Sequence, residues 1–170
     1  MTSDVALAKL ATIERCLQRI ATVTGGDPER VEDIDVEEIV VLNLQRAIQA
    51  SIDLAAHLIS GKGWGLPDSL KAHFQILADQ GIVSSALAAH LISGKGWGLP
   101  DSLKAHFRIL ADHGIVSPAL AAHLRAMTGF RNIAVHDYER LDRAVLKGIL
   151  RERLGDLSAF ADAVRAAAGV

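Results

Sequence analysis

The sequence FRNIAVHDY at residues 130–138 decides how the rest of the chain is interpreted. It sets Arg131, His136 and Tyr138, the only tyrosine of the chain, within eight positions. On an uninterrupted α-helix five residues rotate by about 140°, so the arginine and the histidine would point to different faces. They converge only if the helix unwinds near Val135 or if a second protomer supplies the complementary group.

These residue types suit metal-free cleavage of RNA. A histidine whose pKa is near neutrality can take the proton from a ribose 2′-OH, and an arginine fork can hold the phosphate and its developing charge. DNA lacks this internal nucleophile. A structural alternative stays open from the spacing alone: Arg131 makes a surface ion pair and His136 caps a helix C-terminus, where a cation is favourable.

Around this motif the sequence predicts helices only. Apolar residues recur at helical spacing over residues 6–20, and Gly25 and Gly26 close this first helix. Asp27 followed by Pro28 predicts a short turn. No stretch alternates polar and apolar residues as a strand does. The predicted fold class is therefore all-α.

Two further helices have predicted starts. Asp35 with Glu38 three residues later is a capping-box pattern, which predicts a long helix over 36–60. Asp137 can cap a last helix that runs from 138 to about 167. A helix break at Asp137 is also what a convergence of the arginine and the histidine would need.

A tandem repeat separates these parts. HLISGKGWGLPDSLKAHFQILADQGIVSSALAA (57–89) returns at 90–122 with three differences, which are Gln75/Arg108, Gln80/His113 and Ser85/Pro118. A solenoid needs about three or more repeats and capping units, so a duplication inside one helical bundle fits better. Both copies have the same local preferences, so either could fill one packing slot. We expect the other copy to add a helical hairpin or to be exchanged between protomers.

Each copy predicts the same local elements. A Gly/Pro turn, GKGWGLP, leads into a helix capped by Asp68 or Asp101, and a glycine ends that helix. In the second copy this glycine is Gly114, and Ser117 with Pro118 then begins another helix. The glycines of the turn lack the GxxxxGK[ST] spacing of a phosphate-binding loop, and Trp64 and Trp97 are predicted to be packing or interface residues.

Composition predicts one domain over residues 1–170. No apolar run is long enough to span a membrane, and no signal peptide is recognisable, so a cytoplasmic protein is expected. Cys16, the single cysteine, lies on an apolar helix face and is predicted to be a buried, inert thiol. The histidines are largely repeat copies without metal-ligand spacing, so neither a metal nor a cofactor is expected.

The net charge of −2 is unevenly distributed. Residues 1–56 carry five Lys/Arg against ten Asp/Glu, whereas residues 121–153 carry seven against four. A locally basic segment can hold phosphate groups, but a solvated helix face has the same sequence pattern.

The motif and several flanking stretches resemble one family. Residues 131–138 match the RX4-6H motif of HEPN domains in the RX4HXY form that is typical of HepT-like toxins. Four further stretches are similar to that family, together with GLPDS: IERCLQRI (13–20), GGDPER (25–30), IVVLNLQRAIQASIDLAAHLIS (39–60) and GFRNIAVHDYERLD (129–142). Without one repeat copy the chain has an ordinary family length.

The resemblance implies an antiparallel HEPN helical bundle with an extra hairpin, in which a homodimer brings two motifs into one cleft. Arg131 and His136 would be the ribonuclease residues, with Asn132 and Asp137 as polar support, and RNA, including tRNA, as the substrate. The implied partner is an MNT-type nucleotidyltransferase antitoxin that transfers AMP from ATP to Tyr138. The added phosphate and bulk would obstruct the substrate phosphate.

Two other functions remain open at the level of sequence. The chain could be a non-catalytic HEPN subunit that binds nucleotide or substrate for its nucleotidyltransferase partner. It could also be a bundle whose activity the duplication has impaired, because the extra 33 residues enter directly before the helix that bears Arg131.

Overall fold

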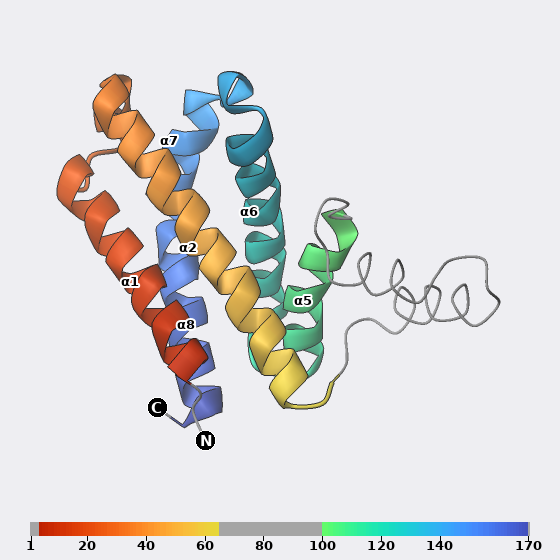
Figure 1. The fold of residues 1–170 in the computed structure, drawn as a ribbon. Coiled ribbons are helices and arrows are strands. Elements are labelled where there is room, and N and C mark those ends of the chain that lie inside the picture. Colours follow the sequence, from red (N-terminus) through yellow and green to blue (C-terminus); the bar gives the residue numbers. More distant parts are fainter. Residues whose placement is uncertain (1–3, 65–99, 170) are drawn as a thin grey trace, which may run out of the picture.

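The computed structural model describes residues 4–64 and 100–169, and these ranges contain helices and no strand (Figure 1). The all-α prediction is confirmed. The elements, with η for short 3-10 helices, are α1 (Asp4–Thr24), η1 (Pro28–Glu32), α2 (Ile34–Gly61), α5 (Pro100–Asp112), α6 (Pro118–His136), η2 (Tyr138–Arg140), α7 (Arg143–Glu152) and α8 (Leu154–Ala168).

One hydrophobic core joins helices from both ends of the sequence. α1 packs along α2, and α8 lies against both, so that α1 begins and α8 ends at the same end of the bundle (Figure 1). The apolar stripe of α1, which includes Leu10, Ile13 and Ile20, is buried as its spacing predicts. Cys16 is buried in this stripe, and burial raises the pKa of its thiol, which suits an unreactive side chain.

Helix α1 ends as predicted. Gly25 and Gly26 have φ angles of +61° and +82°, a backbone region that glycine adopts without steric cost. The carboxylate of Asp27 then accepts a hydrogen bond of 3.0 Å from the backbone N–H of Glu29, with Pro28 in the first position of η1.

Two predicted helix starts are displaced by one or two residues. α2 begins at Ile34, because Asp33, directly after η1, accepts a hydrogen bond of 3.0 Å from the backbone N–H of Asp35 and caps the helix. The capping box predicted at Asp35 is therefore wrong. α5 begins at Pro100, one residue before its predicted cap, since proline suits the first position of a helix.

The described structure joins the start of the first repeat copy to the body of the second. α2 ends with residues of the first copy, whereas α5 and the start of α6 come from the second. α5 lies against α2 and α6, with Phe107 and Leu110 fully buried. The second copy thus fills the packing slot. The predicted extra hairpin, or exchanged segment, falls on residues 65–99, outside the described part of the chain.

The structure shows the environment of all three second-copy residues that differ from the first copy. The ring of His113 stacks on Trp64, with ring centroids 3.8 Å apart and 17° between the planes. Pro118 occupies the first turn of α6 behind the cap Ser117, and Arg108 lies exposed on α5. The first copy has amide or hydroxyl side chains at these positions (Gln75, Gln80, Ser85). The stacking contact and the helix-start proline therefore favour the second copy in the slot.

The prediction of one last helix from Tyr138 to about Ala167 is wrong. Asp137 has φ −151° and ψ 47°, and its side chain makes no capping hydrogen bond. Instead Asp142 caps α7, and Arg153, with φ −121° and ψ −11°, separates α7 from α8. The helix break after α6 is therefore present as predicted. The segment after it forms η2, α7 and α8 instead of one helix.

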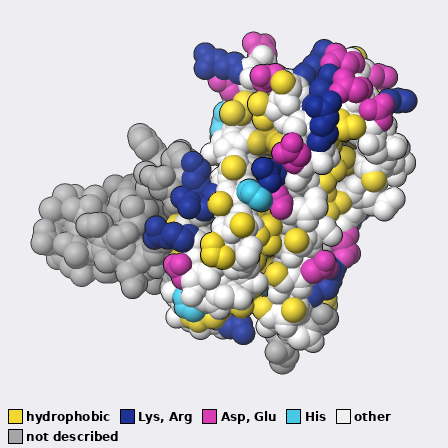
Figure 2. Space-filling model, turned by 180° about the vertical axis from the view of Figure 1, so that it is seen from behind, with side chains coloured by type: hydrophobic (Ala, Val, Ile, Leu, Met, Phe, Trp, Pro, Cys, Tyr) yellow, Lys and Arg dark blue, Asp and Glu magenta, His cyan; other side chains and the backbone are white. Residues whose placement is uncertain are grey.

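Ion pairs connect α7 to η1 and to the start of α2. They join three cations of α7 to carboxylates of η1 and α2 (Arg143, Lys147, Arg151; Glu29, Glu32, Glu37). Lys147 Nζ lies 2.8 Å from Glu29 and 2.5 Å from Glu32, and its hydrogen bonds lower the pKa of both carboxyl groups. Figure 2 shows basic and acidic side chains interleaved at the top right of the surface drawn there. Much of the basic C-terminal segment is therefore neutralised within the molecule.

Candidate functional site

Arg131 lies half-buried on α6, and none of the ion pairs between described residues includes it. Its Nε atom is enclosed and makes no hydrogen bond with any described residue, while Nη1 donates to Oδ1 of Asn132 at 3.1 Å. The surface ion pair of the structural alternative does not occur among the described residues. A guanidinium with an unused donor is suited to an anionic ligand.

His136 is the last residue of α6 and is exposed to solvent. The helix continues without interruption through Val135, and the N–H of Asp137 still bonds to the carbonyl of Ile133 at 2.8 Å. The structure thus excludes the unwinding that would let the two side chains converge within one chain. Helical geometry places Arg131 and His136 about 140° apart around the axis.

The two predicted supporting residues behave differently. Asn132 receives the hydrogen bond of the Arg131 guanidinium and so contributes to its orientation. Asp137 is exposed and pairs with Arg140 at 3.2 Å. Of these two supporting residues, Asn132 is the one whose hydrogen bond to a proposed ribonuclease side chain is found in the described part of the chain.

Tyr138 lies in η2, directly after the motif helix, and its side chain is 41% exposed. Partial burial raises the pKa of its phenol, the negative charges of Glu37 and Glu38 at the start of α2 raise it further, and Arg143 opposes this shift. The phenol is thus accessible, protonated at neutral pH, and set beside two carboxylates and one guanidinium.

A titration tests this environment. Glu37→Gln is expected to lower the pKa of Tyr138, because it removes a negative charge that favours the neutral phenol and leaves Arg143 beside it. Absorbance of the tyrosinate reports on this group alone, since the chain has one tyrosine. Glu139→Gln is the matched control, because Glu139 is not among the groups that cause the shift. Equal pKa values in wild type and Glu37→Gln would contradict the assignment.

Sequence reasoning missed Glu37 and Arg143 as neighbours of the tyrosine. Glu37 is only 7% exposed and holds Arg143 through its Oε2 atom, 3.0 Å from Nε and 2.6 Å from Nη2. The opposite charge excess of residues 1–56 and 121–153 is a signal that the two segments attract each other, but it does not select the pairs.

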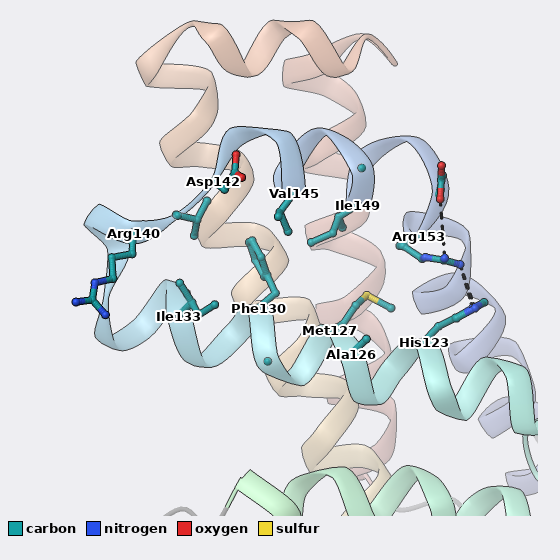
Figure 3. Close-up of a pocket in the computed structure, with 14 residues that line it drawn as sticks. His123, Ala126, Met127, Phe130, Ile133, Arg140, Asp142, Val145, Ile149 and Arg153 are labelled. Carbon is teal, nitrogen blue, oxygen red and sulfur yellow. Dashed lines mark hydrogen bonds and ion pairs between the residues drawn. The ribbon is translucent and has the colours of Figure 1, made fainter.

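A groove of about 530 Å³ lies between α6 and α7 (Figure 3). Its floor is apolar, with Met127, Phe130, Val145 and Ile149 directed into it from the two helices. The side chains at its ends are charged or ionisable (Arg140, Asp142, His123, Glu152, Arg153). None of the three principal motif side chains lines this groove, so it is separate from the predicted site.

The described part of the chain has neither a cluster of metal ligands nor a membrane-spanning helix. Within residues 4–64 and 100–169, no three histidine, cysteine or acidic side chains gather where they could share a metal ion. In the same ranges no helix has the length and apolar character needed to cross a bilayer.

Comparison with known proteins gives the family. The profile described as Ribonuclease HepT-like matches residues 13–89 and again 84–164, so each match takes in one repeat copy. The chain is 30% identical over 164 residues to the mRNA nuclease HepT of Shewanella oneidensis, covering 96% of this chain and 98% of that protein.

Solved structures agree with this result. The tri-AMPylated HEPN toxin of Shewanella oneidensis in complex with MNT antitoxin is 29% identical, with a TM-score of 0.72 and coverage of 97% of this chain and 99% of that chain. A toxin–antitoxin structure with AMP-PNP is 28% identical, with a TM-score of 0.71 and coverage of 96% and 99%.

The fold and the motif together define an all-helical HEPN protein with an RX4HXY sequence. More narrowly, the chain belongs to the Ribonuclease HepT-like family, and the resemblance stated from the sequence is confirmed.

Proposed function

We propose that this chain is the toxin of a HEPN/MNT toxin–antitoxin system and acts as a metal-independent endoribonuclease. Its similarity to an mRNA nuclease and to toxins solved with MNT antitoxin supports this function. The observation that carries the proposal is the intact motif at the end of α6, with an arginine that forms no ion pair with a described residue, an exposed histidine and an accessible tyrosine.

The proposed reaction uses the ribose 2′-OH as the internal nucleophile. His136 takes the 2′-OH proton while the 2′ oxygen attacks the adjacent phosphorus, and the bond from phosphorus to the 5′ oxygen of the next nucleotide breaks. That oxygen leaves and takes a proton from solvent, the proton held by His136 later returns to solvent, and a cyclic phosphate remains. Arg131 binds the phosphate oxygens and stabilises their additional negative charge.

A second copy of the chain completes the proposed site. Arg131 and His136 diverge by about 140° on one straight helix, so one phosphodiester cannot contact both within a single bundle. In a homodimer, Arg131 of one protomer and His136 of its partner can face the same phosphate. This arrangement is the shared cleft that the family resemblance implies.

AMP transfer to Tyr138 is the proposed means of neutralisation. The phenol oxygen attacks the α-phosphorus of ATP bound to the antitoxin, pyrophosphate leaves, and the phenol proton passes to solvent or to a base of the antitoxin. The product carries a negative phosphodiester two residues after His136, where it repels and obstructs the RNA backbone.

The test combines RNA cleavage with the modification. Wild type is expected to cut end-labelled mRNA or tRNA in EDTA, and prior incubation with the MNT antitoxin, ATP and Mg²⁺ is expected to stop cleavage. Tyr138→Phe should remain active after the same treatment, because it lacks the acceptor oxygen. Absence of cleavage by unmodified wild type would reject the ribonuclease in favour of a non-catalytic subunit.

A further inference from the structure

A small hollow between α5 and α6 holds two arginines from different helices. It has a volume of about 180 Å³ and is lined by Arg108 of α5 and Arg125 of α6. The remaining lining consists of small residues and one acid (Ala111, Asp112, Pro118, Ala121, Ala122). The hollow is too small for a drug-sized ligand or a buried base. The guanidinium groups of its two lining arginines can bind an anion.

Within residues 4–64 and 100–169, no ion pair neutralises either arginine. Both are exposed, and neither makes an ion pair with a described residue, whereas Arg143, Lys147 and Arg151 on α7 are all paired with glutamates. Figure 2 shows basic side chains gathered at the left edge of the described surface, on the side of α5 and α6. The hollow therefore has two cationic side chains against one acid, Asp112, and an anion bound between the arginines offsets their mutual repulsion.

The hollow shares a face of α6 with the proposed general base. Arg125, Gly129, Asn132 and His136 follow each other at intervals of four, three and four residues, which keeps them on one side of the helix. Eleven residues rise about 16 Å along the axis, a distance of a few nucleotides in an extended strand. A strand lying along α6 can therefore contact both ends of this face.

We propose that Arg108 and Arg125 bind backbone phosphates of the RNA strand whose cleavage is assigned to His136. This inference rests on the proposed ribonuclease function and adds a substrate-binding surface to it. The contact is to phosphate and not to a base, because the hollow offers guanidinium forks and small side chains but no aromatic surface for stacking.

One of the two arginines of this surface is found only in the second repeat copy. Arg108 is one of the three positions at which the copies differ, and the first copy has Gln75 there. A chain with the first copy in the packing slot would present one arginine in the hollow instead of two. The variant Arg108→Gln therefore places the glutamine of the first copy at this position and removes the proposed phosphate contact.

Salt-dependent binding of RNA provides the measurement. In a His136→Ala background, which leaves the RNA intact, end-labelled single-stranded RNA is titrated at several salt concentrations. Each of Arg108→Gln and Arg125→Gln is expected to reduce the slope of log K against log salt by about 0.7, the loss of one phosphate contact on a single strand. This corresponds to roughly fivefold weaker binding at 0.1 M salt, and the double variant should lose both contacts.

Arg151→Gln is the matched control, because it removes the same charge from an exposed arginine that is paired with Glu29. Its salt slope is expected to stay near that of the parent protein. If wild type cleaves RNA but both hollow variants keep the parent slope, the inference is overturned and the ribonuclease stands. A loss of antitoxin affinity at an unchanged RNA slope would assign the hollow to the protein partner and also overturn it. If wild type neither binds nor cleaves RNA, both proposals fall.

Discussion

Mixing Arg131→Ala protein with His136→Ala protein is expected to restore RNA cleavage that each variant lacks alone. Loss of the general base should lower the rate by about 10²–10⁴-fold, and loss of the phosphate-binding guanidinium by about 10²–10³-fold. The shared cleft of a dimer holds two arginine–histidine pairs, each with the arginine of one protomer and the histidine of its partner. In a mixed dimer one pair is intact, and the other lacks both side chains.

The size of the recovery follows from this geometry. With free exchange at equal concentrations, half of the dimers are mixed and each has one intact arginine–histidine pair of two, so activity should return to about a quarter of wild type. A double variant lacking both side chains is the control, because it restores nothing with either single variant. Mixed dimers that form, as seen by co-purification of two tags, yet remain inactive would contradict a site shared between protomers.

The second large effect is expected in the core. Phe107→Ala should lower the free energy of unfolding by about 3–5 kcal/mol, because the fully buried ring leaves a cavity between α5 and α8. Phe107 meets Phe160 edge-on, with centroids 5.6 Å apart and 85° between the rings. A double-mutant cycle between these two positions should give a coupling energy of about 0.5–1.5 kcal/mol.

Phe74, the counterpart of Phe107 in the first copy, provides the matched control. Phe74→Ala should show no coupling with Phe160, because the position opposite this ring is occupied by Phe107. Denaturant unfolding of wild type, the three single variants and the two double variants supplies the free energies. A coupling energy between residues 74 and 160 equal to that between 107 and 160 would show that the copies share the slot.

Helix ends that short local patterns specify could be predicted from the sequence. Ser117 accepts the N–H of Leu120 at 3.1 Å and Pro118 follows it, as the Ser-Pro pair predicts. Gly114 has φ +71°, as its position after α5 predicts. Such features depend on a few neighbouring residues, so their physical chemistry is fully present in the sequence.

Features that depend on distant partners could not be predicted. The copies have the same local preferences, and contacts such as that of His113 with Trp64 distinguish them only in the folded chain. The break between α7 and α8 falls at Arg153, where no side-chain cap hydrogen bond forms and no local pattern identifies it.

The motif is the part of the candidate site that the sequence reveals. Its geometry is less accessible: spacing alone left open an unwound helix, whereas the structure has a continuous α6. The carboxylates beside Tyr138 come from residues about one hundred positions earlier in the chain, and no local pattern identifies them.

The join between the two repeat copies also has a genetic consequence. Loss of residues 65–97 would connect Trp64 to Gly98 and regenerate the same GKGWGLP turn, while every described residue is retained. Recombination between the two nearly identical coding stretches can produce this in-frame excision in one event. The insertion is thus reversible during evolution, and a shortened sister gene would encode the same Trp64–His113 stack and the same buried interior.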